Sequence, residues 1–110
     1  MEKLDGKKLK ISVFISGRGT NLKSILKFSK KKRIKFEVTL VVSNNKNAKG
    51  LTYAKRNNIK YEIVNYKNKK KAESKILKVL NKNNIDLICL AGFMKILSKR
   101  IIKKYKNKIL

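Results

Sequence analysis

The chain has 110 residues and 31 basic against 6 acidic side chains, which gives a formal net charge of +25; it contains one cysteine and no histidine. This length can bury one core, and no apolar run approaches the roughly 20 residues that cross a bilayer. A single cysteine excludes an internal disulfide, and the lack of histidine removes the commonest zinc ligand and general base. We therefore expect a soluble cytoplasmic protein without a metal site.

The basic charge by itself does not predict recognition of a nucleic acid. Only four of the basic residues are arginine, although bidentate contacts to phosphates and bases favour arginine over lysine. The lysines are spread over every predicted helix and loop. We attribute them to a global compositional bias, and we expect weak, salt-sensitive binding to polyanions without sequence specificity.

Apolar runs alternate with amphipathic segments, which is typical of βα units that build a parallel sheet with helices on both faces. Residues 1–8 form a polar amino-terminal extension, and the predicted domain covers 9–110. The predicted strands are 10–16, 37–43, 61–64 and 86–91, and the predicted helices are 21–31, 48–57, 70–83 and 98–104. Because crossovers are right-handed, the simplest α/β topology is doubly wound and mostly parallel, with the first and fourth strands as neighbours.

The first predicted strand runs directly into a turn with the sequence Ser16-Gly-Arg-Gly-Thr-Asn-Leu22. Gly17 and Gly19 permit turn conformations that a side chain forbids, and Thr20 and Asn21 are suited to cap the helix that follows. Free N–H groups at the start of a helix favour an anion. The turn lacks the third glycine of a dinucleotide fingerprint and the Gly-Lys-Ser/Thr of a Walker loop. It predicts either a phosphate site of another kind or a tight turn that only connects two elements.

A second run, Leu90-Ala-Gly-Phe-Met-Lys-Ile-Leu97, stands at the carboxyl end of the fourth predicted strand. Ligands of doubly wound sheets bind outside the carboxyl ends of the strands at a switch point, so the two runs should border one crevice. Composition leaves two interpretations of the second run. It is either a strand end whose Met94 and Leu97 fill the core, or the apolar wall of a ligand pocket.

Together the two runs resemble those of the phosphoribosylglycinamide formyltransferases, the folate-dependent enzymes of purine biosynthesis. The order and separation of the runs and their strand-then-loop context match, and the resemblance extends over about residues 9–110, the first half of a typical member. It implies a formyltransferase-like, Rossmann-like fold, truncated here. The implied reaction transfers a formyl group from 10-formyltetrahydrofolate to the amine of 5-phosphoribosylglycinamide, without a metal.

The resemblance also implies which residues contact the two substrates. The 5-phosphate would be bound by Gly19, Thr20 and Asn21. The folate would be contacted by Lys69, Met94, Lys95, Ile96 and Leu97. Many relatives carry arginine in place of Lys95, and a compact ammonium lacks the planar fork through which arginine makes bidentate contacts.

No catalytic residue is expected within this chain. Formyl transfer requires a group that stabilises the tetrahedral oxyanion and a group that moves protons. In the family these belong to an Asn-x-His-Pro run, supported by a more distant Asp, and that run is expected directly after Leu110. The chain is therefore expected to be inactive alone. Asp86 opens a strand and Glu73 is expected on a helix surface, so both are interpreted as structural.

Two other functions remain open at this point. One is another enzyme of the folate formyl group, such as a transfer-RNA formyltransferase or a formyltetrahydrofolate hydrolase, against which the Gly-Thr-Asn-Leu turn argues. The other is a non-catalytic basic module that binds anions or RNA. The expected partners are 5-phosphoribosylglycinamide and folate, with no specific nucleic acid and no membrane. Without a fifth strand, Leu87, Ile88 and Leu90 would form an exposed sheet edge that invites self-association.

Overall fold

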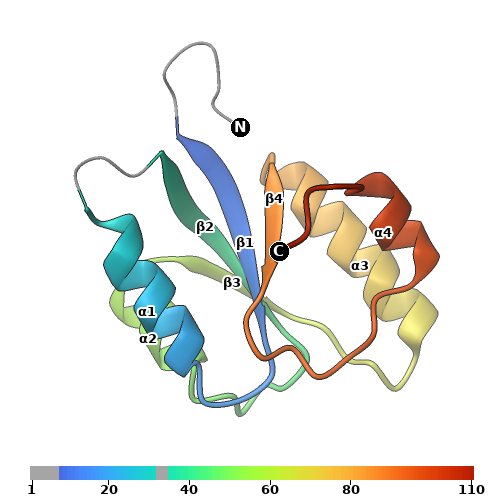
Figure 1. Cartoon of the computed structure of the whole chain (residues 1–110). Helices are drawn as coiled ribbons and strands as arrows, with labels where there is room; N and C mark the ends of the chain where they lie inside the picture. Colours follow the sequence, from blue (N-terminus) through green and yellow to red (C-terminus); the bar gives the residue numbers. More distant parts are fainter. Residues whose placement is uncertain (1–7, 32–34) are drawn as a thin grey trace.

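The computed structural model describes residues 8–31 and 35–110, and it shows the predicted alternation of strands and helices (Figure 1). The strands are β1 (Leu9–Ile15), β2 (Phe36–Ser43), β3 (Lys60–Ile63) and β4 (Leu87–Leu90). The helices are α1 (Thr20–Ser29), α2 (Leu51–Arg56), α3 (Lys69–Lys82) and α4 (Lys99–Lys104). All eight predicted elements are present. Residues 1–7 of the predicted extension lie outside the described residues.

The four strands are parallel and stand in the order β3-β2-β1-β4. The prediction that the first and fourth strands are neighbours is therefore confirmed. At the centre of the sheet, Val13 of β1 lies between Val41 of β2 and Cys89 of β4. The direction of the crossovers reverses at β1, and this is the switch point at which doubly wound sheets bind their ligands.

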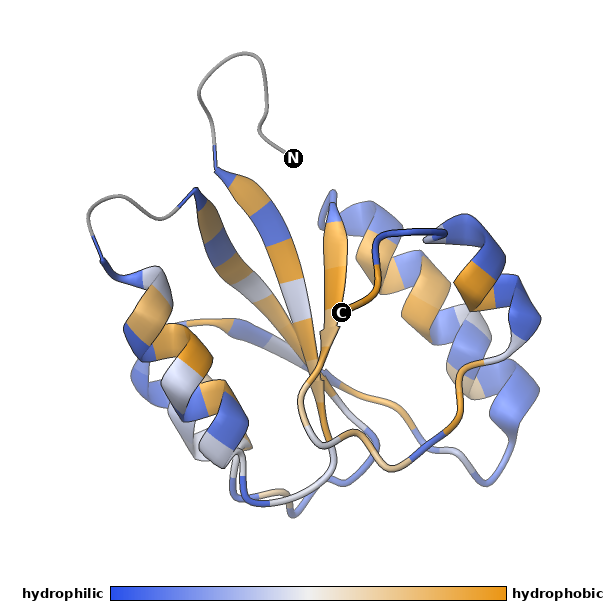
Figure 2. Cartoon of the chain, viewed as in Figure 1, coloured by the Kyte–Doolittle hydropathy of each residue, from blue (hydrophilic) through white to orange (hydrophobic). Residues whose placement is uncertain are grey.

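Helices α1 and α2 lie on one side of the sheet, and α3 and α4 lie on the other (Figure 1). Side chains of β1 alternate between two apolar layers: Val13 and Ile15 pack with α1 and α2, whereas Phe14 packs with α3 and α4. Both helical layers turn apolar residues toward the sheet and lysines toward solvent (Figure 2). Lysine therefore occupies mainly exposed positions, as the interpretation of a compositional bias requires.

Helix α3 follows its predicted periodicity and differs from the prediction at one residue. Asn68 caps the helix by accepting a hydrogen bond from the Lys71 N–H at 3.0 Å. The expectation that Glu73 lies on the surface is wrong, because its side chain is only 4% exposed. Its Oε2 atom accepts the backbone N–H of Ser98 at 2.9 Å. This partly buried N–H at the entrance of α4 needs an acceptor, and Glu73 supplies it.

The expectation that β4 is left as a bare edge is also wrong. Residues 108–110 already run parallel to β4: Ile88 donates to the Lys108 carbonyl, and Leu110 donates to the Ile88 carbonyl, both at 2.8 Å. Ile88 is fully buried, whereas Leu90 is 39% exposed. The sequence analysis assigned no element to residues 108–110, although they pair with β4 through an isolated β-bridge between Ile88 and Ile109. Self-association through the edge that remains is still a prediction.

Asp86 directly precedes β4 and has a structural role. Its Oδ2 atom accepts the Lys10 N–H, and its own N–H donates to the Lys10 carbonyl, both at 2.8 Å. This pair fixes the start of β4 against β1. Across residues 8–31 and 35–110, no helix combines the length and the apolar character that a bilayer span requires.

Candidate functional site

Ser16 joins the carboxyl ends of three strands at one edge of the sheet. Its hydroxyl donates to the side-chain oxygen of Asn44 and accepts the Met94 N–H at 2.8 Å, and its carbonyl accepts from the Asn45 side chain at 3.3 Å. The two asparagines follow β2 and Met94 follows β4. The two runs that the sequence singled out therefore meet at the switch point, where Ser16 holds them together.

Residues 17–21, here called the glycine turn, connect β1 to α1. Gly19 occupies the N-cap position with φ +75°, and no side chain caps the helix. The expectation that Thr20 and Asn21 cap α1 is therefore wrong, because both residues are already inside the first helical turn. Their side chains are exposed. The first-turn N–H groups thus have no side-chain cap, which is the arrangement that a helix start offers to an anion.

The glycine turn rests on a second glycine, Gly50, which directly precedes α2. The Gly50 N–H donates to the Gly17 carbonyl at 3.0 Å. A Cβ atom on Gly19 would lie 2.3 Å from the Cα atom of Gly50, which is closer than any real contact. The sequence analysis missed Gly50, although a glycine inside the first turn of the predicted helix 48–57 was the available signal.

Residues 91–97, here called the apolar loop, follow β4. Met94 and Ile96 are 79% and 82% exposed, and Lys95 is exposed between them, whereas Leu97 is buried in the layer under α3 and α4. The interpretation as core filling is thus right for Leu97 and wrong for Met94. Three of the four predicted residues of the loop have exposed side chains, and the buried Leu97 anchors the loop to the core.

Two aromatic contacts fix the middle of the apolar loop. Phe93 packs edge-on against Phe14 of β1 and Tyr66, with ring centroids 5.3 and 5.9 Å apart. Through Tyr66 the loop also contacts the connection between β3 and α3. Burial, and to a lesser extent the charge of Glu73, raises the pKa of Tyr66 to about 12, so the buried phenol is neutral at physiological pH.

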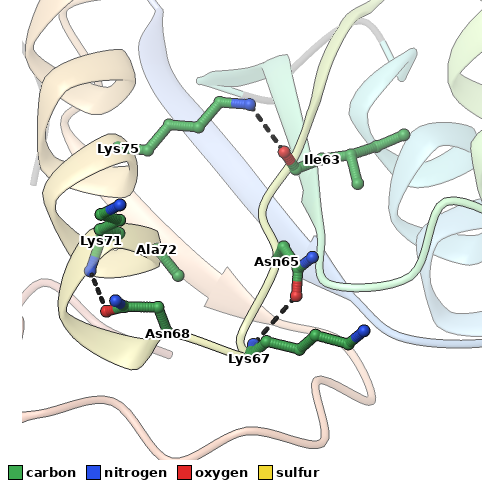
Figure 3. A pocket seen from close by; sticks show the side chains of 7 residues that line it. All are labelled: Ile63, Asn65, Lys67, Asn68, Lys71, Ala72 and Lys75. Carbon is green, nitrogen blue, oxygen red and sulfur yellow. Dashed lines mark hydrogen bonds between the residues drawn. The ribbon is translucent and has the colours of Figure 1, made fainter.

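Lys69 is the first residue of α3, and its side chain is exposed beside a cavity of about 360 Å³. Figure 3 shows that the cavity lies between the end of β3 and the first turns of α3. The basic residues that line it are Lys67, Lys71 and Lys75 rather than Lys69. Lys75 is held in place, because its Nζ atom donates to the Ile63 carbonyl at 2.7 Å. The basic character of this corner comes from several lysines together.

The described part of the chain contains no cluster of three side chains that could hold a metal ion. The two carboxylates that the sequence analysis interpreted as structural each accept a backbone N–H, Glu73 from Ser98 and Asp86 from Lys10. Both are therefore engaged in holding the fold. The site as described can bind and orient ligands, and it presents no side-chain pair arranged for proton transfer.

A parallel doubly wound sheet with an uncapped helix start and an exposed apolar loop at its switch point is the arrangement at which α/β proteins bind small ligands with an anionic group. The comparison with family models narrows this class. Residues 9–110 match the model of the formyl transferase family, and the chain belongs to that family.

Individual relatives show the same likeness. The chain is 40% identical over 111 residues to the trifunctional purine biosynthetic protein adenosine-3 of Gallus gallus. This alignment covers 98% of this chain and 11% of that protein. It is 36% identical to the phosphoribosylglycinamide formyltransferase of Haemophilus influenzae, over 92% of this chain and 49% of that one. The chain therefore spans about half the length of the latter relative.

Solved structures share the fold as well as the sequence. The phosphoribosylglycinamide formyltransferase of Brucella melitensis superposes with a TM-score of 0.90 at 32% identity, covering 94% of this chain and 55% of that one. The enzyme of the same name from Anaplasma phagocytophilum gives a TM-score of 0.84 at 35% identity. The Rossmann-like formyltransferase fold implied by the sequence motifs is thus confirmed.

Proposed function

We propose that this chain supplies the substrate-binding half of a phosphoribosylglycinamide formyltransferase. The reaction transfers the formyl group of 10-formyltetrahydrofolate to the amine of 5-phosphoribosylglycinamide. The observation that carries the proposal is the junction at Ser16, which fixes the glycine turn and the apolar loop side by side at the switch point. The printed names of the relatives supply the reaction.

The phosphate is proposed to bind at the start of α1. Gly19, Thr20 and Asn21 offer N–H groups without a side-chain cap, and the positive end of the helix dipole favours an anion there. Side chains of Thr20 and Asn21 are exposed and can add further donors. The family likeness favours this function over a connecting turn.

The folate is proposed to bind against the apolar loop. Met94 and Ile96 present apolar side chains suited to a flat heterocycle, and Lys95 lies between them. Lys69 is proposed to contact the acidic part of the folate from the first turn of α3. The Tyr66–Phe93 contact links these two regions, because it joins the segment before α3 to the apolar loop.

Catalytic groups are proposed to come from the part of the family domain that this chain does not span. In the reaction the amine nitrogen attacks the formyl carbon, the carbonyl oxygen becomes an oxyanion, and the bond from carbon to the folate nitrogen then breaks. One proton leaves the amine and one is gained by the leaving nitrogen. This chain positions the two reactants, which can by itself lower a barrier by several kcal/mol.

Isothermal calorimetry with 5-phosphoribosylglycinamide tests the phosphate site. Asn21→Asp introduces a negative charge at the proposed site and should weaken binding at least tenfold. Asn81→Asp makes the same change at an exposed position in the last turns of α3 and should leave binding unchanged. Equal weakening by both variants would mean that the ligand is held by overall charge, as in a general anion-binding module.

An RNA competitor separates the proposed enzyme from the basic binding module. If the crevice is specific, unstructured RNA at physiological salt should not displace the nucleotide substrate, because binding of RNA to scattered lysines is weak and salt-sensitive. Complete displacement by RNA would favour the binding module. Since RNA binding to scattered lysines is weak, we also propose that the chain has no specific nucleic-acid partner. A cytoplasmic location is a separate part of the proposal.

A formylation assay tests the division of labour. The purified chain alone should show no transfer, and the chain mixed with the carboxyl-terminal half of the Haemophilus influenzae relative should show folate-dependent transfer. Activity of the chain alone would contradict the proposal that catalysis depends on the other half.

A further inference from the structure

Strand β3 is an outer edge of the sheet, and within the described fold it pairs only with β2. In a parallel ladder, successive residues offer their N–H and carbonyl groups to opposite sides of the strand. The Val64 N–H, just after β3, donates to the Ser43 carbonyl of β2 at 2.8 Å. The backbone groups of Tyr61 and Ile63 therefore face away from β2, and they form an edge with which a further strand can pair.

One backbone group of this edge is occupied by a side chain. The Nζ atom of Lys75, on α3, donates to the Ile63 carbonyl at 2.7 Å (Figure 3). The same atom lies 3.8 Å from the Glu62 carboxylate, and the Lys75 side chain is 48% exposed. A lysine ammonium stands on a flexible stem. It satisfies the carbonyl without covering the strand, and a backbone N–H of a partner can replace it there.

A hollow of about 490 Å³, here called the β3 groove, lies between this edge and the second half of α3. Its charged lining residues are one carboxylate and four lysines: Glu62, Lys60, Lys75, Lys78 and Lys82. The last three recur at i, i+3 and i+7, so they stand in one row along α3. Arg100 adds a guanidinium at the rim, because its Nη2 atom donates at 2.8 Å to the hydroxyl of Ser74, another lining residue. The β3 groove therefore attracts an anionic partner.

We propose that the β3 groove binds an extended acidic segment of another protein, which adds to β3 as a further strand. The backbone of this segment pairs with Tyr61 and Ile63, as in other cases of strand addition to a sheet edge. Its acidic side chains on the α3 side pair with Lys78 and Lys82. The ammonium of Lys75 leaves the Ile63 carbonyl and pairs with a carboxylate of the segment, which is a stronger, charge-assisted contact.

The geometry also specifies the sequence pattern of the segment. Side chains on one face of a strand recur about 7 Å apart, and the row from Lys75 to Lys82 extends over roughly 10 Å of helix axis. Two or three acidic residues at alternate positions match this row. The residues between them face the α2 side, where Tyr61 is 37% exposed and the Lys55 ammonium lies 5.5 Å from its ring centroid. Aromatic and β-branched side chains are suited to pack beside Tyr61.

Two other occupants fit the β3 groove less well. None of its lining residues is aromatic, whereas single-stranded nucleic acids bind by stacking their bases on aromatic side chains. A second copy that paired β3 with β3 would bring the same lysines toward each other, and like charges opposed across a strand pair are destabilising. An acidic peptide supplies both the backbone groups and the charges that this edge lacks.

Binding of a labelled peptide, followed by fluorescence anisotropy at physiological salt, tests the proposal. The probe is Glu-Val-Glu-Tyr-Glu-Val-Glu. One control peptide has the same composition with its glutamates gathered at one end, and the other is the probe with N-methyl groups on its backbone amides. We expect saturable one-to-one binding of the probe and at least tenfold weaker binding of both controls. Hydrogen exchange of the Tyr61 and Ile63 amides should become at least tenfold slower in the complex.

A pair of double variants separates the β3 groove from overall charge. Lys78→Gln with Lys82→Gln removes two charges from the groove and should weaken binding of the probe at least fivefold. Lys103→Gln with Lys104→Gln removes the same charge from α4 and should leave binding unchanged. All four side chains are exposed, so neither double variant disturbs the core.

Absence of saturable binding would overturn the proposal, and so would equal weakening by the two double variants, because net charge would then account for binding. Equal binding of the probe and its N-methylated form, or unchanged exchange at Tyr61 and Ile63, would overturn strand addition. Displacement of the probe by 5-phosphoribosylglycinamide would place the peptide at the switch point instead. Tighter binding of an unstructured RNA that displaces the probe would assign the groove to nucleic acid. Protection of the Tyr61 amide that rises with the concentration of the chain alone would identify a second copy as the occupant.

Discussion

The carboxylate of Glu73 accepts the backbone N–H of Ser98 at 2.9 Å, and this contact fixes the end of the apolar loop to α3. The Ser16 hydroxyl accepts the Met94 N–H in the middle of the loop, so that residues 94–98 are held at both ends. The exposed side chains of Met94, Lys95 and Ile96 therefore stand on a segment whose backbone is held at both ends. Such fixation limits the entropy that a ligand must remove when it binds.

Replacing Glu73 should loosen the loop more than it loosens the rest of the fold. Glu73→Leu leaves the Ser98 N–H without an acceptor, which should lower the free energy of unfolding by about 1–3 kcal/mol. Glu73→Gln keeps an acceptor oxygen and should cost less. Urea denaturation measures both, with Glu62→Leu as a control at the exposed ion pair with Lys75. A loss at Glu62 equal to that at Glu73 would contradict the assigned contact.

Ser16→Ala should separate the glycine turn from the apolar loop. It removes the donor to Asn44 and the acceptor of the Met94 N–H, and we expect a loss of about 1–2 kcal/mol in unfolding free energy. Hydrogen exchange of the Met94 amide should become faster. Ser24→Ala, at an exposed position on α1, is the matched control and should leave that exchange rate unchanged. Unaltered Met94 exchange in the Ser16 variant would refute the junction.

Three glycines, two in the glycine turn and one in the apolar loop, form a graded test of the backbone geometry of the site. Gly17 has open space around it, Gly92 has open space but φ +75°, and Gly19 has φ +75° together with the close approach to Gly50. Gly17→Ala should leave stability nearly unchanged, Gly92→Ala should cost about 1–2 kcal/mol, and Gly19→Ala should cost about 2–5 kcal/mol. Thermal unfolding would contradict this order if Gly17→Ala and Gly19→Ala had the same midpoint.

The raised pKa of Tyr66 has a consequence at alkaline pH. Because the folded state holds this pKa at about 12, above its ordinary value of 10.0, the folded protein keeps a proton that the unfolded chain releases. The resulting contribution to stability is complete below pH 10 and is lost as the pH rises through 12. A spectroscopic titration of tyrosinate should show a late step that Tyr66→Phe removes. Glu73→Gln should move that step to lower pH, since a negative charge that opposes ionisation is lost.

The strands, the helices and their order were predictable because each rests on local periodicity. Val13 and Phe14, for example, belong to an apolar run that only a strand covered on both faces explains. The site was less predictable where contacts join distant segments. Gly50 approaches Gly19, and Ser16 meets Met94 78 residues away, through geometry that no short pattern encodes.

Glu73 was misplaced for a different reason. It lies three residues before Ile76 and seven before Leu80, a spacing that puts all three on one face of the helix. The periodicity therefore indicated burial, and the charge of the side chain argued against it. Glu73 is buried because the Ser98 N–H needs an acceptor. That need can be recognised only when α4 is placed beside α3.

The pairing of β1 with β4 also determines when the crevice can form. The contact between Lys10 and Asp86 spans 76 residues, whereas β1, β2 and β3 follow one another closely along the chain. Contacts of such long separation form late, because the intervening chain must first be ordered. A nascent chain that has reached residue 64 already contains the glycine turn and three strands, and it still lacks the opposite wall of the crevice. Under the proposed function, binding of the substrates reports completion of the sheet, and they can stabilise only molecules in which β4 has joined.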